Sequence, residues 1–217
     1  MDLSKKLPAP GRVIFILIIF YAVGVAGLSS AATKDLIELL TPYTLLMNLV
    51  LLALYHRPWT KKHVVLFTVI AVTGYLVEVA GVYTGLVFGD YNYHHVLGIK
   101  LFDTPLMIGI NWLMLIYFTY HLVGLARFSR PVAVITGALI MVTYDIILEP
   151  VAIRMNMWSW EGGIIPLQNY LAWLIISIVF LALLHTFKVR AENRISRGLF
   201  AVQAGFILAL NIIYRFI

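Results

Sequence analysis

Long apolar runs separated by short polar segments constrain this chain more than any other feature of its sequence. A helix that crosses a bilayer needs about 20 mostly apolar residues, and the chain of 217 residues is 62% hydrophobic but only 12% charged. A soluble domain of this size needs a polar shell over its core. The composition therefore excludes a soluble enzyme, a disordered tail and a nucleic-acid-binding module, and it favours a helical membrane protein.

Seven apolar runs predict an all-α fold, a polytopic integral membrane bundle of seven transmembrane helices. We expect this bundle to form a single transmembrane domain over residues 1–217. The expected spans are 12–29, 36–55, 63–83, 105–125, 131–149, 167–188 and 198–217.

Basic residues predict the orientation of the bundle, because cytoplasmic loops are enriched in Lys and Arg. Twelve of the 16 basic residues cluster around the N-terminus and around the loops after the second, fourth and sixth spans. They are Lys5, Lys6, Arg12, Arg57, Lys61, Lys62, Arg127, Arg130, Lys188, Arg190, Arg194 and Arg197. This distribution predicts a multi-pass protein of the plasma membrane, with its N-terminus in the cytoplasm and its C-terminus outside.

Three acidic residues lie within the predicted spans, whereas most other acids lie in loops or tails. Glu78 is roughly 7 Å inside the outer end of the third span, and Asp145 is about 6 Å inside the outer end of the fifth. Asp145 and Glu149 are spaced i, i+4 and share one helical face. Pro150 disfavours helix at the preceding residue, so we expect the fifth helix to end at Glu149. A carboxylate in hydrocarbon costs several kcal/mol, so these acids are the candidate catalytic residues.

An alternative interpretation gives these acids a structural role, in which they pair with Arg154, Lys100 or neutral polar side chains. However, carboxyl groups outnumber the cations on that side of the membrane. Burial and mutual repulsion then favour retention of a proton by at least one of them. A protonated acid at neutral pH is what general-acid chemistry requires.

Aromatic and amide side chains gather near the same end of the spans. They lie in the segments 89–95 and 157–163 and in the fourth and sixth spans. Such rings form either an aromatic belt at the membrane interface or the walls of a cavity whose π-faces stabilise a cation. The candidate substrate-binding residues are Tyr91, Tyr93, His94, Asn111, Trp112, Trp158, Trp160, Asn169 and Trp173.

A short internal repeat accompanies this pattern. Pro105 precedes Trp112 by the same seven-residue step that separates Pro166 from Trp173, and each pair follows an acid-bearing span. The third and fourth spans and the fifth and sixth spans are therefore candidates for two parallel repeats about an axis along the membrane normal.

The absence of several motifs narrows the chemistry. The sequence has no cysteine, no glycine-rich nucleotide loop, no spaced histidine boxes and no lysine in the last span. Two adjacent histidines, His94 and His95, rarely bind one ion together, so no metal site is expected. What remains is acid–base chemistry on a lipophilic substrate, without a cofactor.

Two blocks of residues resemble the conserved blocks of the CruF-type carotenoid biosynthesis proteins. The first contains Glu78-Val79-Ala80-Gly81, Phe88-Gly89-Asp90-Tyr91-Asn92-Tyr93, Leu97-Gly98 and Thr104-Pro105-Leu106 through Trp112. The second contains Asp145-Ile146-Ile147-Leu148-Glu149-Pro150-Val151-Ala152, Trp158-Ser159-Trp160, Ile165-Pro166-Leu167 and Asn169 through Trp173.

The resemblance implies a carotenoid 1,2-hydratase, a cofactor-independent hydro-lyase that adds water across the terminal C1=C2 double bond of an acyclic ψ-end. Bacterial members of the family act on substrates similar to lycopene or γ-carotene, and archaeal relatives act on the C50 bisanhydrobacterioruberin. The implied partners are the carotenoid, membrane lipid and other enzymes of the carotenoid pathway. Our physical interpretation assigns Glu78 or Asp145 as the proton donor, while the other acid and Glu149 orient and deprotonate water.

Two other functions remain open at this point. A carotenoid cyclase of the lycopene-cyclase kind starts with a similar protonation but excludes water. A proton-coupled transporter would use intramembrane acids as a relay, although the inner half of the spans offers few candidates beyond His121.

Overall fold

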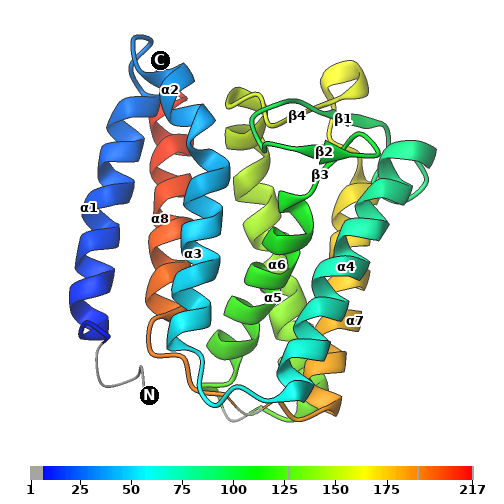
Figure 1. The fold of residues 1–217 in the computed structure, drawn as a ribbon. Helices are drawn as coiled ribbons and strands as arrows, with labels where there is room; N and C mark the ends of the chain where they lie inside the picture. The colour runs from blue at the N-terminus through cyan, green and yellow to red at the C-terminus, as the bar shows by residue number, and fades with distance from the viewer. Residues whose placement is uncertain (1–6, 127, 190, 217) are drawn as a thin grey trace. The chain divides into compact units, whose positions relative to one another are not determined.

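The computed structural model describes residues 7–126, 128–189 and 191–216, and within these ranges the chain is mostly α-helical (Figure 1). This confirms the predicted all-α class. The elements are α1 (Pro10–Leu28), α2 (Lys34–Leu39), α3 (Thr41–Tyr55), α4 (Lys61–Thr84), β1 (Tyr91–Tyr93), β2 (Lys100–Leu101), β3 (Thr104–Pro105), α5 (Met107–Val123), α6 (Arg130–Arg154), β4 (Trp158–Trp160), the 3-10 turn η2 (Glu161–Gly163), α7 (Leu167–Thr186) and α8 (Ser196–Ile213).

Five of the described helices are long and apolar enough to cross a membrane, namely α1, α4, α6, α7 and α8. The shorter apolar helices α3 and α5 coincide with the predicted spans 36–55 and 105–125. The count of seven spans and the orientation stay predictions. Some of the residues behind them lie outside the described part of the chain: Lys5, Lys6, Arg127, Arg190 and Ile217.

The structure corrects two predicted helix boundaries. The span 36–55 is divided into α2 and α3 at Leu40, because Pro42 in the first turn of α3 cannot continue the preceding helix. The fifth predicted helix does not end at Glu149, since α6 runs through Pro150 to Arg154. An internal proline costs about 3 kcal/mol. The residues that follow Pro150 are buried, with Val151 1% exposed, so close packing accompanies the additional turn of helix.

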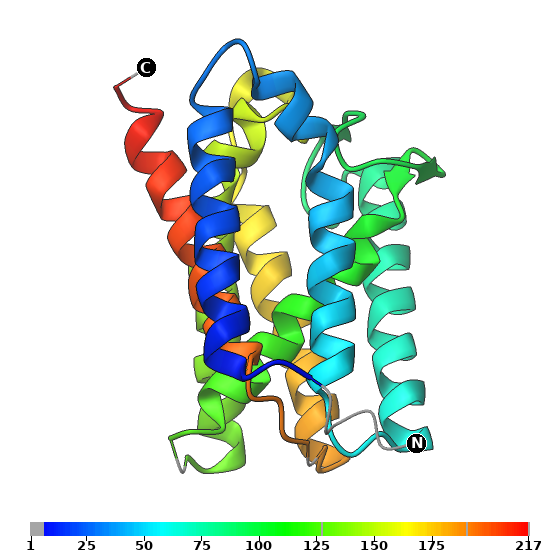
Figure 2. The same cartoon turned by 60° about the vertical axis from the view of Figure 1, so that its left-hand side comes forward.

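The chain divides into two compact units. Unit 1 contains α1, α2, α3 and α8, and α1 and α8 lie side by side in it (Figure 2). A Cβ atom built on Gly198 would come 2.8 Å from Ile14, so the small residue permits close packing of these helices. The Tyr21 hydroxyl of α1 accepts hydrogen bonds from Asn48 Nδ2 at 2.5 Å and Gln203 Nε2 at 3.4 Å. A buried polar contact thus connects three helices of unit 1.

Unit 2 contains α4 to α7 and the four strands, which lie at one end of the helices (Figure 1). We call this the strand end. Helices α4 and α5 pack closely because Gly74 contacts Trp112 and Gly109 faces the backbone of Ala71. Helix α6 packs along α7, where Gly137 makes room for Leu181.

The segments that follow α4 and α6 pair with each other in a way that the sequence analysis did not predict. Strands β1 and β4 are antiparallel, with Tyr91 opposite Trp160 and Tyr93 opposite Trp158. Successive side chains of a strand point to opposite faces, and all four rings are buried. The small sheet therefore fixes four aromatic side chains on the face that points into unit 2.

Candidate active site

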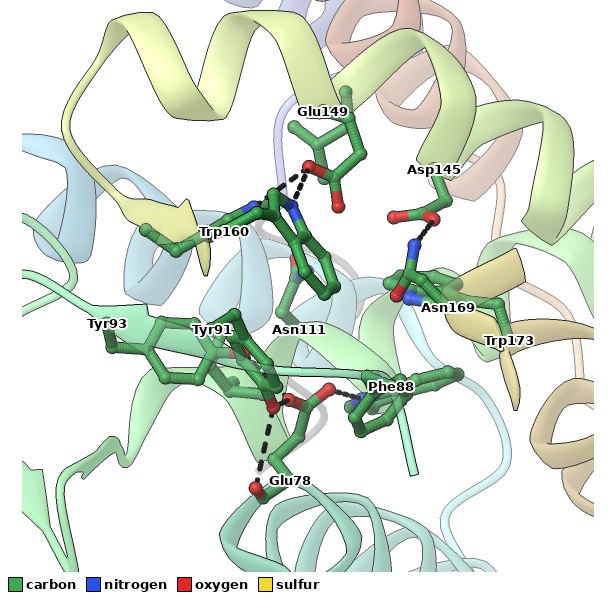
Figure 3. Close-up of a pocket in the computed structure, with 14 residues that line it drawn as sticks. Glu78, Phe88, Tyr91, Tyr93, Asn111, Asp145, Glu149, Trp160, Asn169 and Trp173 are labelled. Atoms are coloured by element: carbon green, nitrogen blue, oxygen red, sulfur yellow. Dashed lines mark hydrogen bonds between the residues drawn. The ribbon is translucent and has the colours of Figure 1, made fainter. Parts of the chain in front are cut away.

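The three intramembrane acids meet at one cavity near the strand end of unit 2 (Figure 3). The cavity has a volume of about 30 Å³, which is room for one or two water molecules. Its other lining residues are Phe88, Tyr91, Tyr93, Ile108, Asn111, Trp112, Leu148, Trp158, Trp160, Asn169 and Trp173. The site is thus enclosed mainly by aromatic side chains, with acids and two amides as its polar groups.

Glu78 is held by three hydrogen-bond donors. Its Oε2 accepts from the hydroxyls of Tyr91 and Tyr93, each at 2.7 Å, and its Oε1 accepts from Trp112 Nε1 at 2.8 Å. The side chain is 4% exposed. Hydrogen bonds donated to a carboxylate stabilise its charged form, so Glu78 has the most such support of the three acids.

The two phenols that contact Glu78 belong to β1, outside the helix. Burial, followed by the nearby charge of Glu78, raises the pKa of Tyr91 and of Tyr93 well above the ordinary value. Both hydroxyls therefore keep their protons over the physiological range and act as donors to Glu78.

Glu149 has two donors, and both are indoles of β4. Its Oε2 accepts from Trp158 Nε1 at 3.0 Å and from Trp160 Nε1 at 2.8 Å. Because one oxygen takes both bonds, Oε1 has no hydrogen-bond partner among the described residues. This second oxygen is the part of Glu149 that is available to a molecule in the cavity.

Asp145 has the fewest donors of the three acids. Its Oδ2 accepts one hydrogen bond, from Asn169 Nδ2 at 2.7 Å, and the side chain is 1% exposed. The carboxyl groups of Asp145 and Glu149 lie on one side of the cavity and point toward each other, whereas Glu78 lies on the opposite side (Figure 3). The helical i, i+4 spacing explains why the first two share a side.

No described cation forms an ion pair with any of these three acids. Lys100, one of the expected structural partners, instead donates a hydrogen bond to the backbone carbonyl of Tyr93. Buried charges without a counter-ion are costly. The cavity therefore cannot hold three full negative charges cheaply, and its acids are expected to retain at least one proton.

Stacked rings complete the walls. Trp112 and Trp173 are stacked with centroids 4.3 Å apart, and they come from α5 and α7. The rings of Tyr91 and Trp160, which lie opposite each other in the sheet, have centroids 5.1 Å apart. Aromatic faces carry negative potential and attract cations, so a positive charge that develops in this cavity would be stabilised by its walls.

The structure brings eight of the nine predicted substrate-binding residues to the cavity together with the three acids. His94 is the exception, since its Nε2 lies 3.0 Å from Ser159 Oγ on the sheet and it does not line the cavity. Sequence reasoning did not single out Phe88, Ile108 and Leu148 as site residues. Phe88 had a local signal, because it directly precedes the aromatic segment 89–95.

Within the described ranges, no group of three or more His, Cys, Asp or Glu side chains is arranged to hold a metal ion. The donor set of the cavity consists of carboxyl, amide, hydroxyl and indole groups. Such groups donate and accept hydrogen bonds, and the carboxyl groups can also gain or lose a proton.

Fold and site together describe a helical protein with apolar spans and a buried acid cluster, and sequence comparison gives its family. The model of the carotenoid biosynthesis protein family matches residues 40–215, so the chain belongs to that family. The chain is also 29% identical over 109 residues to bisanhydrobacterioruberin hydratase from Haloarcula japonica. That match covers 46% of this chain and 37% of the relative's length. No solved structure matches this chain.

Proposed function

We propose that this protein is a carotenoid 1,2-hydratase, which adds water across the terminal C1=C2 double bond of an acyclic ψ-end. The observation that carries this proposal is the cluster of three buried carboxyl groups, without a paired cation among the described residues, around a water-sized and aromatic-walled cavity. Membership of the family and the name of the halophilic relative support it.

Asp145 is the proposed proton donor. It accepts a single hydrogen bond, whereas Glu149 accepts two and Glu78 accepts three from side chains. Each donated hydrogen bond favours the ionised carboxylate, so Asp145 is the acid on which a proton is best retained. Its position beside the cavity would bring that proton next to a bound alkene.

The proposed water site lies between the second oxygen of Glu149 and the amide of Asn111, which also lines the cavity. Glu149 Oε1 is available as an acceptor, and an amide offers both a donor and an acceptor. Water placed there is oriented with one proton on the carboxylate and with a lone pair directed into the cavity.

The reaction proceeds in two bond-forming steps. The Asp145 proton adds to the less substituted alkene carbon, the π bond breaks, and a tertiary cation forms at the other carbon. The water oxygen then bonds to this cation, and Glu149 takes the proton that the water loses. Transfer of that proton back to Asp145, its i, i+4 neighbour, restores the starting state, and the net change is the addition of one water.

The opposite side of the cavity stabilises the intermediate. An ionised Glu78 and the stacked faces of Trp112 and Trp173 present negative potential to the tertiary cation. Their hydrogen bonds and packing fix these groups before the reaction, so little reorganisation is needed when the charge appears.

The cavity volume also sets a requirement for substrate binding. The cavity has room for one or two water molecules, and the isopropylidene end of a carotenoid contains several carbon atoms of comparable size. The ψ-end therefore enters only if side chains of the cavity wall move aside. Closure around the end group then excludes additional water, which protects the cation from uncontrolled capture.

The proposed membrane arrangement keeps the seven spans, with the N-terminus in the cytoplasm and the strand end of unit 2 outside. Helix α5 has 17 residues, about 25 Å, which is somewhat less than the hydrocarbon core of about 30 Å. Short spans are accommodated by local thinning of the bilayer. The proposed location is the plasma membrane.

Expression of the chain in a host that accumulates lycopene tests the proposed activity. A hydratase yields a more polar pigment whose mass is greater by one water, and label from ¹⁸O-water appears in it. A new pigment of unchanged mass would instead indicate a cyclase, and unchanged lycopene with folded protein in the membrane would contradict the proposal.

A further inference from the structure

An apolar groove lies on the surface of unit 2 between α4 and α7, and we call it the α4–α7 groove. Its volume is about 440 Å³, and all but one of its lining residues are aliphatic. The lining includes Val77 of α4, Val87 of the following loop, and Leu167, Leu171, Ala172 and Ile175 of α7. It is a separate hollow from the acid cavity, and nothing in the chemistry described above uses it.

The groove and the acid cavity share a wall. Four groove residues each directly precede a cavity residue in the chain, since Val77 precedes Glu78, Val87 precedes Phe88, Gln168 precedes Asn169 and Ala172 precedes Trp173. Adjacent side chains on a helix point about 100° apart, so one of each helical pair faces the groove and the other faces the acids. Phe88 and Trp173 are the two aromatic cavity residues among these neighbours, which makes them the candidates for the partition between the two hollows.

Hydrogen bonds from Gln168 cross the groove near the strand end. Gln168 Nε2 donates to the backbone carbonyls of Gly85 at 3.1 Å and Leu86 at 2.6 Å. These bonds connect the first turn of α7 to the turn that follows α4. Gly89 also lies against Pro166, where a Cβ atom would approach Pro166 Cγ to 2.5 Å. A long molecule therefore enters from the side or from the far end, not past Gln168.

Along α7 the groove presents several exposed apolar side chains. Leu167 is 71% exposed and Ile175 is 61% exposed. The groove residues from Leu167 to Ile176 span about 14 Å of helix, roughly half of the hydrocarbon core. This length and apolar lining suit part of a long, stiff hydrocarbon chain, with the remainder in lipid.

We propose that the α4–α7 groove binds the polyene chain of the carotenoid next to its reacting end, and that Phe88 and Trp173 move to admit that end into the acid cavity. This inference rests on the proposed function, because it names where the same substrate lies outside the catalytic cavity. The continuity between groove and cavity favours the substrate over a bulk lipid chain, which has no reason to end at a buried acid cluster.

Ala172 is the position at which the groove is most easily blocked. It has the smallest side chain of the groove, and it precedes the wall residue Trp173. In Ala172→Phe a ring would occupy the volume assigned to the polyene. Ala182→Phe provides a matched control, because Ala182 is also a half-buried alanine of α7 and does not line the groove.

The test measures binding and turnover separately. Lycopene is titrated into purified protein carrying Asp145→Asn, which stops the proposed reaction, and its induced circular dichroism reports a bound polyene. We expect Ala172→Phe in this background to weaken binding at least tenfold and Ala182→Phe to leave it unchanged. Equal affinity in the two variants, or no lycopene signal in the Asp145→Asn protein, would refute the proposal that the α4–α7 groove binds the polyene.

Turnover separates failure of the groove from failure of the reaction. With Asp145 present, Ala172→Phe should raise KM for lycopene at least tenfold while hydration of geranylacetone, a short ketone with the same isopropylidene end, changes less than twofold. Hydration of lycopene with an unchanged KM would refute the groove alone. Groove-dependent binding without hydration would refute the reaction alone. Val77→Trp, from the opposite wall, repeats the test if Ala172→Phe does not give folded protein.

Discussion

The two halves of unit 2 repeat one plan with different outcomes. The first half is α4, β1 and α5, and the second is α6, β4 and α7. In each half an acid precedes the first strand ring by thirteen residues, as Glu78 precedes Tyr91 and Asp145 precedes Trp158. Each following helix carries a tryptophan, and these two tryptophans stack on each other.

The difference between the halves lies in which acid the strand holds. In the first half the rings of β1 donate to Glu78, the acid at the repeated position. In the second half the rings of β4 donate to Glu149, one turn beyond the repeated position. Asp145 is thereby left with Asn169 as its donor. The additional acid thus takes the hydrogen bonds of the strand in place of the repeated acid. In the proposed mechanism, one half would hold a charge while the other would supply a proton.

The largest expected effect comes from Asp145→Asn. An amide cannot donate a proton to an alkene, so hydration should fall by about 10²–10⁴-fold, the usual contribution of a general acid. The measurement is product formation by purified protein at equal concentration of folded enzyme. Glu161→Gln, a change of an exposed acid of unit 2, is the control and should retain full activity. An Asp145→Asn protein with more than a tenth of wild-type activity would show that Asp145 is not the proton donor, and the two halves would then not differ in this role.

Glu78→Gln should have the next largest effect. The amide keeps the shape but removes the charge that faces the cation, so we expect about 10²-fold lower kcat with KM within about threefold. The altered hydrogen bonds to β1 and Trp112 should also lower the free energy of unfolding by about 1–3 kcal/mol. A loss confined to KM would show that Glu78 binds the substrate and does not stabilise the transition state.

Trp160→Phe tests the half of unit 2 that contains Glu149. It removes one of two donors to Oε2, so a smaller decrease in kcat is expected, about tenfold, with about 1 kcal/mol lost from the free energy of unfolding. Tyr91→Phe removes one of three donors to Glu78 and is the matched change in the other half. If Tyr91→Phe lowers kcat more than Trp160→Phe does, then the half that carries Glu78 is the more sensitive to proton placement, contrary to our assignment.

Alkaline pH should produce the smallest effect. The pKa values of Tyr91 and Tyr93 are raised in the folded protein, so the folded state binds more protons than the unfolded state above about pH 10. Their contribution to stability is present below that pH and is lost above it, at up to about 1.4 kcal/mol per pH unit for each group. Denaturant unfolding at pH 8 and pH 10.5 measures this loss, which should be smaller in the double variant Tyr91→Phe/Tyr93→Phe. Equal losses in both proteins would show that these phenols do not remain protonated.

The helices and the acid cluster were accessible from the sequence because their signals are strong. Apolar runs of membrane length indicate the spans. An acid inside such a run is easily recognised, because placing it in hydrocarbon is costly and therefore rare. The i, i+4 spacing correctly predicts one side of the cavity for Asp145 and Glu149. The aromatic residues are also recognisable, since eight of the nine candidates line the cavity.

The features that the sequence did not reveal depend on packing between distant segments. Strands β1 and β4 have three residues each, too few for alternation to be distinguished from an aromatic loop. The rule that a helix ends before a proline fails at Pro150, where the following residues are buried and the helix continues to Arg154. His94 lies next to the predicted aromatic cluster in the chain, but its side chain is within hydrogen-bond distance of Ser159 on the sheet and does not line the cavity.

The hydrogen bonds of Gln168 have a consequence for symmetric pigments. If the α4–α7 groove holds the polyene as proposed, a chain that cannot be threaded through the site must back out before its second terminus can react, so catalysis would be distributive. Product with a single new alcohol would leave first, accumulate transiently in the bilayer, and be free to diffuse to another catalyst before its return.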